Sequence, residues 1–241
     1  MGRVKIARKS TFIDMTAMSD VTVLLLTFFM LTSTFLQKEP ATVITPPSVS
    51  TEKVQETNYV QVLVDPQGKV WLTMNNDTSS NFGNEKMRAA LLDKVSEIYN
   101  ESHKNKISFT AEQKYAFGKI GTFGVPLNQM GEYLDLYSQQ EGQTKMDKWL
   151  SGTDENPNHI TGIPISWNSD DQKPNEFQMW MKAMRQSDNT ALTDKIKDGT
   201  GVAIKADQNT SFDVVHMVMD NLQTIHMNKF TLLTALKGES E

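Results

Sequence analysis

Asp20 stands directly before an apolar stretch, Val21 to Leu36, that contains no charged residue. Thr27 and Thr34 follow Asp20 by seven and fourteen residues, and Thr16 precedes it by four, so all four lie along one stripe of a helix. The opposite faces carry Leu, Phe and Val. A polar stripe on an apolar helix suits a channel or an interface with other helices. Because a single helix cannot enclose such a stripe, the pattern predicts partner helices.

An ionisable side chain within a membrane span costs about 2.5–3.5 kcal/mol on insertion scales, so it usually faces protein or water instead of lipid. This description applies to Asp20 if the helix begins upstream of it. The alternative is that Asp20 lies at the headgroup boundary and only ends the helix.

The helix that must position Asp20 is longer than the apolar stretch itself. Sixteen residues, Val21 to Leu36, extend over about 24 Å, which is less than the roughly 30 Å hydrocarbon core. We therefore predict a transmembrane helix over 15–36. A cleaved signal peptide is the alternative. Its amino-terminal region would, however, be unusually long and would contain two acidic residues, and no clean cleavage site follows the apolar stretch.

The charges on either side of the span predict its orientation. The first fourteen residues contain four basic side chains and, until Asp14, no acidic one, whereas Lys38 and Glu39 cancel on the other side. This asymmetry places 1–14 in the cytoplasm and the remainder of the chain outside it. The basic residues are Arg3, Lys5, Arg8 and Lys9.

The segment Ile13 to Asp20, which reads IDMTAMSD and runs into a Leu/Phe-rich helix, resembles the amino-terminal signature of the ExbD/TolR family. Ala17 stands where that family usually has Pro. In the family the last Asp of the signature is the proton-carrying carboxylate, and it corresponds to Asp20. The resemblance implies a channel- or partner-facing stripe around that group.

The segment 37–58 is polar, rich in β-branched residues and interrupted by prolines, so we predict an extended periplasmic linker. Within it, Val43, Thr45 and Pro46 occupy a stretch that is similar to the Val-x-Leu-Pro segment of the family. The resemblance implies strand pairing there, between two subunits or with the partner. A plain spacer is the alternative.

The region 59–241 is predicted to be an α+β periplasmic domain, with helices on a mixed sheet. Residues 59–64 and 69–74 flank an Asp-Pro-Gln-Gly turn and predict a hairpin. Apolar residues at helical spacing predict a helix over 84–101. The stretch 202–234, predicted as strand, helix and strand, is similar to the carboxyl end of ExbD/TolR periplasmic domains.

Residues 104–189 form an insert that short family members lack, and we predict that it is largely helical. Its expected helices are 111–119, 127–137 and 175–186. The insert is either a structural elaboration or a partner-binding platform. For a platform, Trp149, Trp167 and Trp180 are the candidate anchors, although burial in the core is the usual place for Trp.

Composition excludes several classes of function. From residue 37 onward the chain has 20 Lys and Arg against 27 Asp and Glu, and this acidic balance argues against nucleic-acid binding. Cysteine is absent, and the four histidines stand at no metal-ligand spacing. No nucleotide-binding loop or nucleophile motif is present. We therefore expect no enzyme activity, no cofactor and no metal site.

The resemblance implies one subunit of an inner-membrane motor that is driven by the proton-motive force, of the ExbB–ExbD type, and that energises TonB-dependent outer-membrane transport. Its partners would be a multi-span ExbB/TolQ-like ring subunit, a TonB-like protein and a second copy of the chain. The alternatives are a TolR-like subunit of the Tol-Pal envelope system and a membrane-tethered periplasmic binding module, in which Asp20 would be dispensable.

Overall fold

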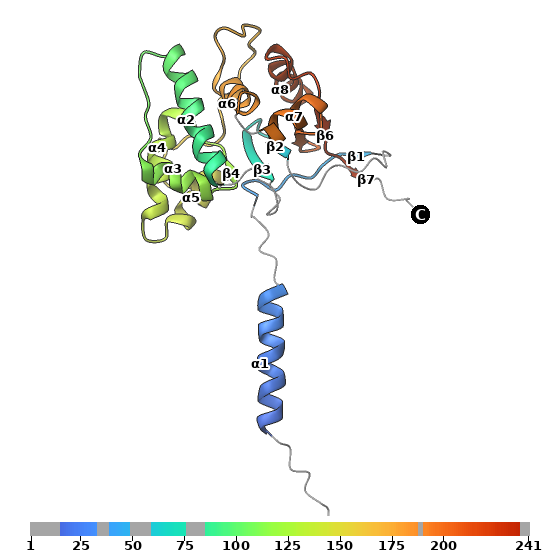
Figure 1. The fold of residues 1–241 in the computed structure, drawn as a ribbon. Helices are drawn as coiled ribbons and strands as arrows, with labels where there is room; N and C mark the ends of the chain where they lie inside the picture. The colour runs from blue at the N-terminus through green and yellow to red at the C-terminus, as the bar shows by residue number, and fades with distance from the viewer. Residues whose placement is uncertain (1–14, 33–38, 49–58, 76–84, 188–189, 237–241) are drawn as a thin grey trace, which may run out of the picture. The chain divides into compact units, whose positions relative to one another are not determined.

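The computed structural model describes residues 15–32, 39–48, 59–75, 85–187 and 190–236. The chain divides into two compact units, Met1–Lys38 and Glu39–Glu241. The described part of the first unit is one helix, α1 (Met15–Thr32). The predicted cytoplasmic segment 1–14 lies outside the described residues. The second unit contains every strand and the remaining helices of the described chain (Figure 1).

A mixed five-stranded sheet forms the centre of the second unit, as predicted for an α+β domain. Its strand order is β4-β3-β2-β5-β6, with β2 antiparallel to β3 and parallel to β5. β4 pairs antiparallel with β3, and β6 pairs parallel with β5. The bounds are β2 (Tyr59–Val64), β3 (Val70–Asn75), β4 (Thr122–Phe123), β5 (Val202–Ala206) and β6 (Thr231–Leu232).

The β2–β3 hairpin follows from its turn chemistry. The Asp65 carboxylate accepts hydrogen bonds from the backbone N–H groups of Gln67 and Lys69, at 2.9 and 2.8 Å. Gly68 has φ +81°, a conformation that favours glycine. All six residues of β2 are buried, because β2 lies between two other strands inside the domain. The hairpin prediction is confirmed.

Seven helices and one 3₁₀ turn accompany the sheet in the described part of the second unit. Figure 1 shows α2 to α5 grouped at one end of the domain and α7 and α8 at the other. α6 packs against α2, α7 and α8. The bounds are α2 (Glu85–Ser102), α3 (Ala111–Lys119), α4 (Leu127–Asp135), η1 (Leu136–Ser138), α5 (Gly142–Ser151), α6 (Glu176–Arg185), α7 (Thr190–Asp198) and α8 (Phe212–Thr224).

Two predicted helices of the insert begin at capping boxes. Thr110 accepts from the N–H of Gln113, and the Gln113 side chain accepts from the N–H of Thr110. Asn175 and Gln178 form the same pair at the start of α6. Both pairs satisfy N–H groups that a helix leaves without partners at its amino end.

The insert shares the core of the sheet. Trp71 of β3 is buried, and its indole N–H donates to the carbonyl of Leu150 in α5 at 3.2 Å. A Cβ atom at Gly124 would lie 2.1 Å from Cδ1 of Trp71, so only glycine fits there. Phe117, Phe123 and Trp180 form one aromatic cluster, with ring centroids 4.6 to 5.7 Å apart. The insert also supplies β4, an edge strand of the sheet.

Two of the three tryptophans proposed as partner anchors are core residues. Trp149 and Trp180 are both 0% exposed, so the anchor hypothesis is wrong for them. Their indoles are covered because helices α5 and α6 pack inward, which apolar spacing alone does not reveal. Trp167 is 55% exposed and lies in the loop before α6.

Two further differences from the prediction concern one additional helix and the length of one strand. Helix α5 was not predicted, because it starts at Gly142 after Glu141, whose φ is 59°, and neither residue signals a helix. The second strand predicted within 202–234, at its carboxyl end, is reduced to β6, Thr231–Leu232. Only these two residues find partners on β5, so the pairing is short.

Candidate functional site

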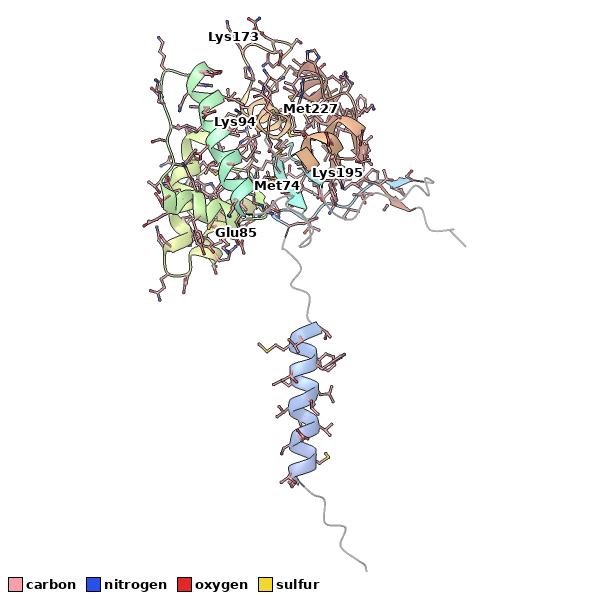
Figure 2. All side chains as sticks on the ribbon, viewed as in Figure 1. Met74, Glu85, Lys94, Lys173, Lys195 and Met227 are labelled. Carbon is pink, nitrogen blue, oxygen red and sulfur yellow. The ribbon has the colours of Figure 1, made fainter. Side chains whose placement is uncertain are left out.

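Helix α1 holds the residues that the sequence pattern singles out, and Asp20 is the one charged residue in it. Figure 2 shows side chains projecting around the whole helix. Large apolar side chains on all sides, such as Leu24, Phe28 and Leu31, are exposed. Within the described residues, no helix is long and apolar enough to qualify as a membrane span. Residues 33–36 of the predicted span lie outside the described part.

Four hydroxyl groups of α1 bond to backbone carbonyls of the same helix. Ser19 donates to the carbonyl of Met15 at 2.8 Å, and Thr27 donates to that of Leu24 at 2.9 Å. Thr22 donates to Met18, and Thr32 donates to Phe28. Such bonds to the preceding turn remove most of the cost of placing a hydroxyl in apolar surroundings.

The Asp20 carboxylate differs from these hydroxyls. Among the described residues, no hydrogen bond or ion pair involves it. Thr16 and Thr27 fall on the same stripe by helical spacing, because seven residues are close to two turns. Thr34 lies outside the described residues. Within its described residues, the helix thus presents one acid without a hydrogen bond or ion pair, on a stripe where the Thr27 hydroxyl is bonded to its own helix.

The structure describes residues 39–48 of the predicted linker, and they belong to the second unit. The N–H of Ile44 donates to Oδ2 of Asp207 at 2.7 Å, and the N–H of Gln208 donates to the carbonyl of Ile44 at 2.8 Å. Glu39 forms an ion pair with Lys205 at 2.6 Å. Val43 is half-buried against the core. Hydrogen bonds, an ion pair and apolar packing therefore hold this segment against the rest of the second unit.

The end of this segment forms a small second sheet within the same chain. β1 (Pro47–Ser48) pairs parallel with β7 (Ala235–Leu236), and the N–H of Ala235 donates to the carbonyl of Pro46 at 3.0 Å. Val43, Thr45 and Pro46 thus lie in a stretch whose partners, in the single chain, come from residues 205–208 and 235–236. Pairing with a second subunit stays a prediction.

The Asp207–Ile44 contact was not singled out from the sequence. Its signal is the Asp-Gln-Asn triplet after a strand, in which an Asp side chain bonds the N–H two residues ahead. Here the N–H of Asn209 donates to Oδ1 of Asp207 at 2.8 Å. The N–H groups of Asn209 and Ile44 hold the pKa of the Asp207 carboxyl below its usual value.

We predict that acid releases the 39–48 segment. Because the pKa of Asp207 is lowered in the folded chain, its contribution is present above the unfolded value, about 3.9. It is lost as the pH falls through the folded pKa. Asp207→Ala should mimic this release at neutral pH, so a broad-specificity protease should cut 39–48 of the full chain in detergent faster. Asp198→Asn, an exposed acid on α7, is the control. Equal cleavage rates in the two variants would contradict the prediction.

Comparison with known proteins identifies the part of the chain that contains these features. A family model described as biopolymer transport protein ExbD/TolR matches residues 7–123. The chain carries an ExbD/TolR family domain. No curated protein and no solved structure matches it. The resemblance read from the amino-terminal signature is confirmed.

The ExbD/TolR match includes α1 with Asp20, the β2–β3 hairpin, α2 and α3, and it ends at Phe123 in β4. It therefore reaches into the predicted insert. The ExbD/TolR family consists of biopolymer transport proteins, so the domain over residues 7–123 is that of a non-enzymatic transport family. The similarity predicted for 202–234 lies outside the matched residues.

Proposed function

We propose that the chain is the small subunit of a proton-driven inner-membrane motor of the ExbB–ExbD type, which energises TonB-dependent outer-membrane transport. Asp20 is the residue that takes up and releases the proton. The observation that carries this proposal is the Asp20 carboxylate, which has no hydrogen bond or ion pair among the described residues, on an apolar helix where Ser19 and Thr27 bond internally. An acid in that setting needs partners from other chains or water.

The membrane anchor in this proposal is α1 together with the apolar residues that follow it. A continuous helix over 15–36 is about 33 Å long, which is sufficient for the hydrocarbon core. The basic residues before Thr11 keep the amino terminus in the cytoplasm and place the α+β domain in the periplasm. Membrane-inserted apolar side chains such as Leu24 and Phe28 would contact lipid or partner helices.

The polar stripe of the helix, which contains Asp20, implies the kind of partner that the chain needs. A multi-span ring of the ExbB/TolQ type would surround the helices of two copies of the chain and exclude lipid from Asp20, Thr16, Thr27 and Thr34. One charge that crosses 100 mV releases about 2.3 kcal/mol. Cycles of protonation and release at Asp20 would turn that free energy into movement of α1 relative to the ring. The periplasmic domain would transmit the movement to a TonB-like protein.

Proton flux in proteoliposomes tests this proposal. The chain is reconstituted with the ExbB/TolQ-type subunit of the same genome, a membrane potential is applied, and an enclosed pH-sensitive dye reports proton entry. We expect flux with the wild-type chain and with Ser19→Ala, whose hydroxyl bonds only to its own helix. Asp20→Asn should reduce flux to that of the ring subunit alone. Equal flux through wild type and Asp20→Asn would overturn the proposal.

A further inference from the structure

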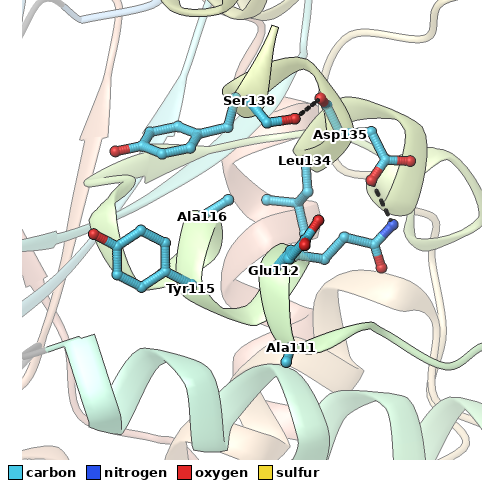
Figure 3. Close-up of a pocket in the computed structure, with 9 residues that line it drawn as sticks. Ala111, Glu112, Tyr115, Ala116, Leu134, Asp135 and Ser138 are labelled. Atoms are coloured by element: carbon cyan, nitrogen blue, oxygen red, sulfur yellow. Dashed lines mark hydrogen bonds between the residues drawn. The ribbon is translucent and has the colours of Figure 1, made fainter.

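A pocket of about 410 Å³ lies between α3 and the end of α4 with η1. The apolar side chains of Ala116 and Leu134 form its floor, and they are 3% and 1% exposed. Figure 3 shows Ala116 between the ring of Tyr115 and the side chain of Leu134. The volume is in the range of sites that hold one small ligand or a few side chains. The lining residues are Ala111, Glu112, Gln113, Tyr115, Ala116, Leu134, Asp135, Tyr137 and Ser138.

The lining of this pocket is acidic and contains no basic side chain. One oxygen of Asp135 accepts from the Gln113 amide at 2.9 Å, as Figure 3 shows. Among the described residues, no hydrogen bond or ion pair involves the Glu112 carboxylate. Two carboxylates and two phenol rings thus border an apolar floor.

The two lysines of α3 form ion pairs with acidic residues of α2. Lys114 forms an ion pair with Asp93 of α2 at 2.7 Å. Lys119 pairs with Glu85, labelled at the start of α2 in Figure 2, and its Nζ lies 5.4 Å from the centre of the Tyr115 ring. Neither lysine neutralises Glu112 through an ion pair. Within the described residues, the Glu112 carboxylate of the pocket therefore has no ion-pair partner.

We propose that this pocket binds an Arg or Lys side chain from a basic, extended segment of a partner protein. The aliphatic part of the side chain packs on Ala116 and Leu134, and its cationic end reaches Glu112 and Asp135. The ring of Tyr137 adds a cation–π attraction, and the exposed ring of Tyr115, which already lies near Lys119, adds apolar contact. The Ser138 hydroxyl, which donates to the Asp135 carbonyl at 3.1 Å, can still accept a hydrogen bond from the peptide backbone.

The acidic charge of the chain favours a basic peptide segment over a neutral ligand. The chain from residue 37 onward has 27 Asp and Glu against 20 Lys and Arg, so its field attracts a basic segment and raises its rate of association. This inference does not depend on proton transport by Asp20. It concerns a pocket built entirely from residues 111–138 of the second unit.

The test is fluorescence anisotropy with the full chain in detergent and a labelled peptide, acetyl-Ala-Leu-Arg-Leu-Ala-amide. Citrulline in place of Arg keeps the shape and removes the charge. Free butylguanidinium is the competitor that represents a small guanidinium cation without a peptide backbone. We expect the Arg peptide to bind about tenfold more tightly than the citrulline peptide, as for one charge-assisted contact. Binding should weaken as salt rises.

Variants then locate the contact. Glu112→Gln should weaken binding of the Arg peptide about tenfold, and Tyr115→Ala should weaken it as well. Both side chains are exposed, so these variants should fold, which circular dichroism checks. Glu101→Gln, an exposed acid on α2, is the matched control and should bind like wild type. The proposal fails if the citrulline peptide binds equally well, if Glu112→Gln changes nothing, or if butylguanidinium binds as tightly as the peptide.

Discussion

Asp20→Asn is expected to reduce energy-dependent uptake through TonB-dependent receptors to the level of a strain that lacks the chain. The substitution keeps the size of the side chain and removes the group that can bind and release a proton. In α1 no described neighbour bonds to Asp20, so an Asn in its place leaves the helix itself intact. The neutral side chain also inserts more easily, because the membrane cost of the charge falls. Assembly with the ring subunit should therefore survive.

Two companion variants sharpen this result. Asp20→Glu restores the acid on a longer side chain and should retain partial uptake. Ser19→Ala removes the adjacent hydroxyl, which bonds to the Met15 carbonyl, and should leave uptake within about twofold of wild type. Each variant is compared at matched membrane levels by uptake of a radiolabelled iron chelate. Full uptake by Asp20→Asn would leave a tethered binding module as the explanation.

The same strains distinguish the two motor assignments. An ExbB–ExbD type subunit predicts that Asp20→Asn abolishes chelate uptake and leaves resistance to detergent unchanged. A TolR-like subunit of the Tol-Pal system predicts the opposite, because envelope integrity would fail while uptake continued. Sensitivity to detergent, scored beside uptake, therefore decides between them.

Deletion of residues 107–188 with a short Gly/Ser bridge is expected to prevent the second unit from folding. The deletion removes β4, α3, α4, α5 and α6, all of which contribute to the core. Trp71 of β3 would lose its contacts with Gly124 and Leu150. The apolar face exposed on β3 and α2 should make the shortened chain aggregate. A soluble, cooperatively unfolding product would show that the insert is a separate elaboration.

A pair of tryptophan variants measures the same effect without a deletion. Trp180→Ala should lower the free energy of unfolding by about 3–5 kcal/mol, a large part of the usual total of about 5–15 kcal/mol. Trp180 is fully buried, and its indole N–H has no acceptor among the described residues, so the loss reports packing alone. Trp167→Ala, at an exposed position, should change the free energy by less than about 0.5 kcal/mol. Urea unfolding of the full chain in detergent, followed by circular dichroism, provides both values.

Several features were predictable from the sequence because they depend on neighbours a few residues away. The Asp65–Gly68 turn sets the hairpin through two side-chain-to-backbone bonds. The capping boxes at Thr110 and Asn175 start α3 and α6. The IDMTAMSD segment with its apolar continuation was sufficient to recognise the family. The spacing of Asp20, Thr16 and Thr27 likewise follows from helical geometry alone.

Other features depend on residues far apart in the chain, and only the tertiary structure decided them. Trp149 and Trp167 are the same residue type, yet one is buried and the other exposed, because α5 packs inward and the loop before α6 does not. The 39–48 segment follows the domain because Asp207, far along the chain, binds Ile44. The acidic pocket exists only where α3 meets the end of α4. Burial and such long-range contacts arise from the packing of whole elements, which local periodicity and turn chemistry do not specify.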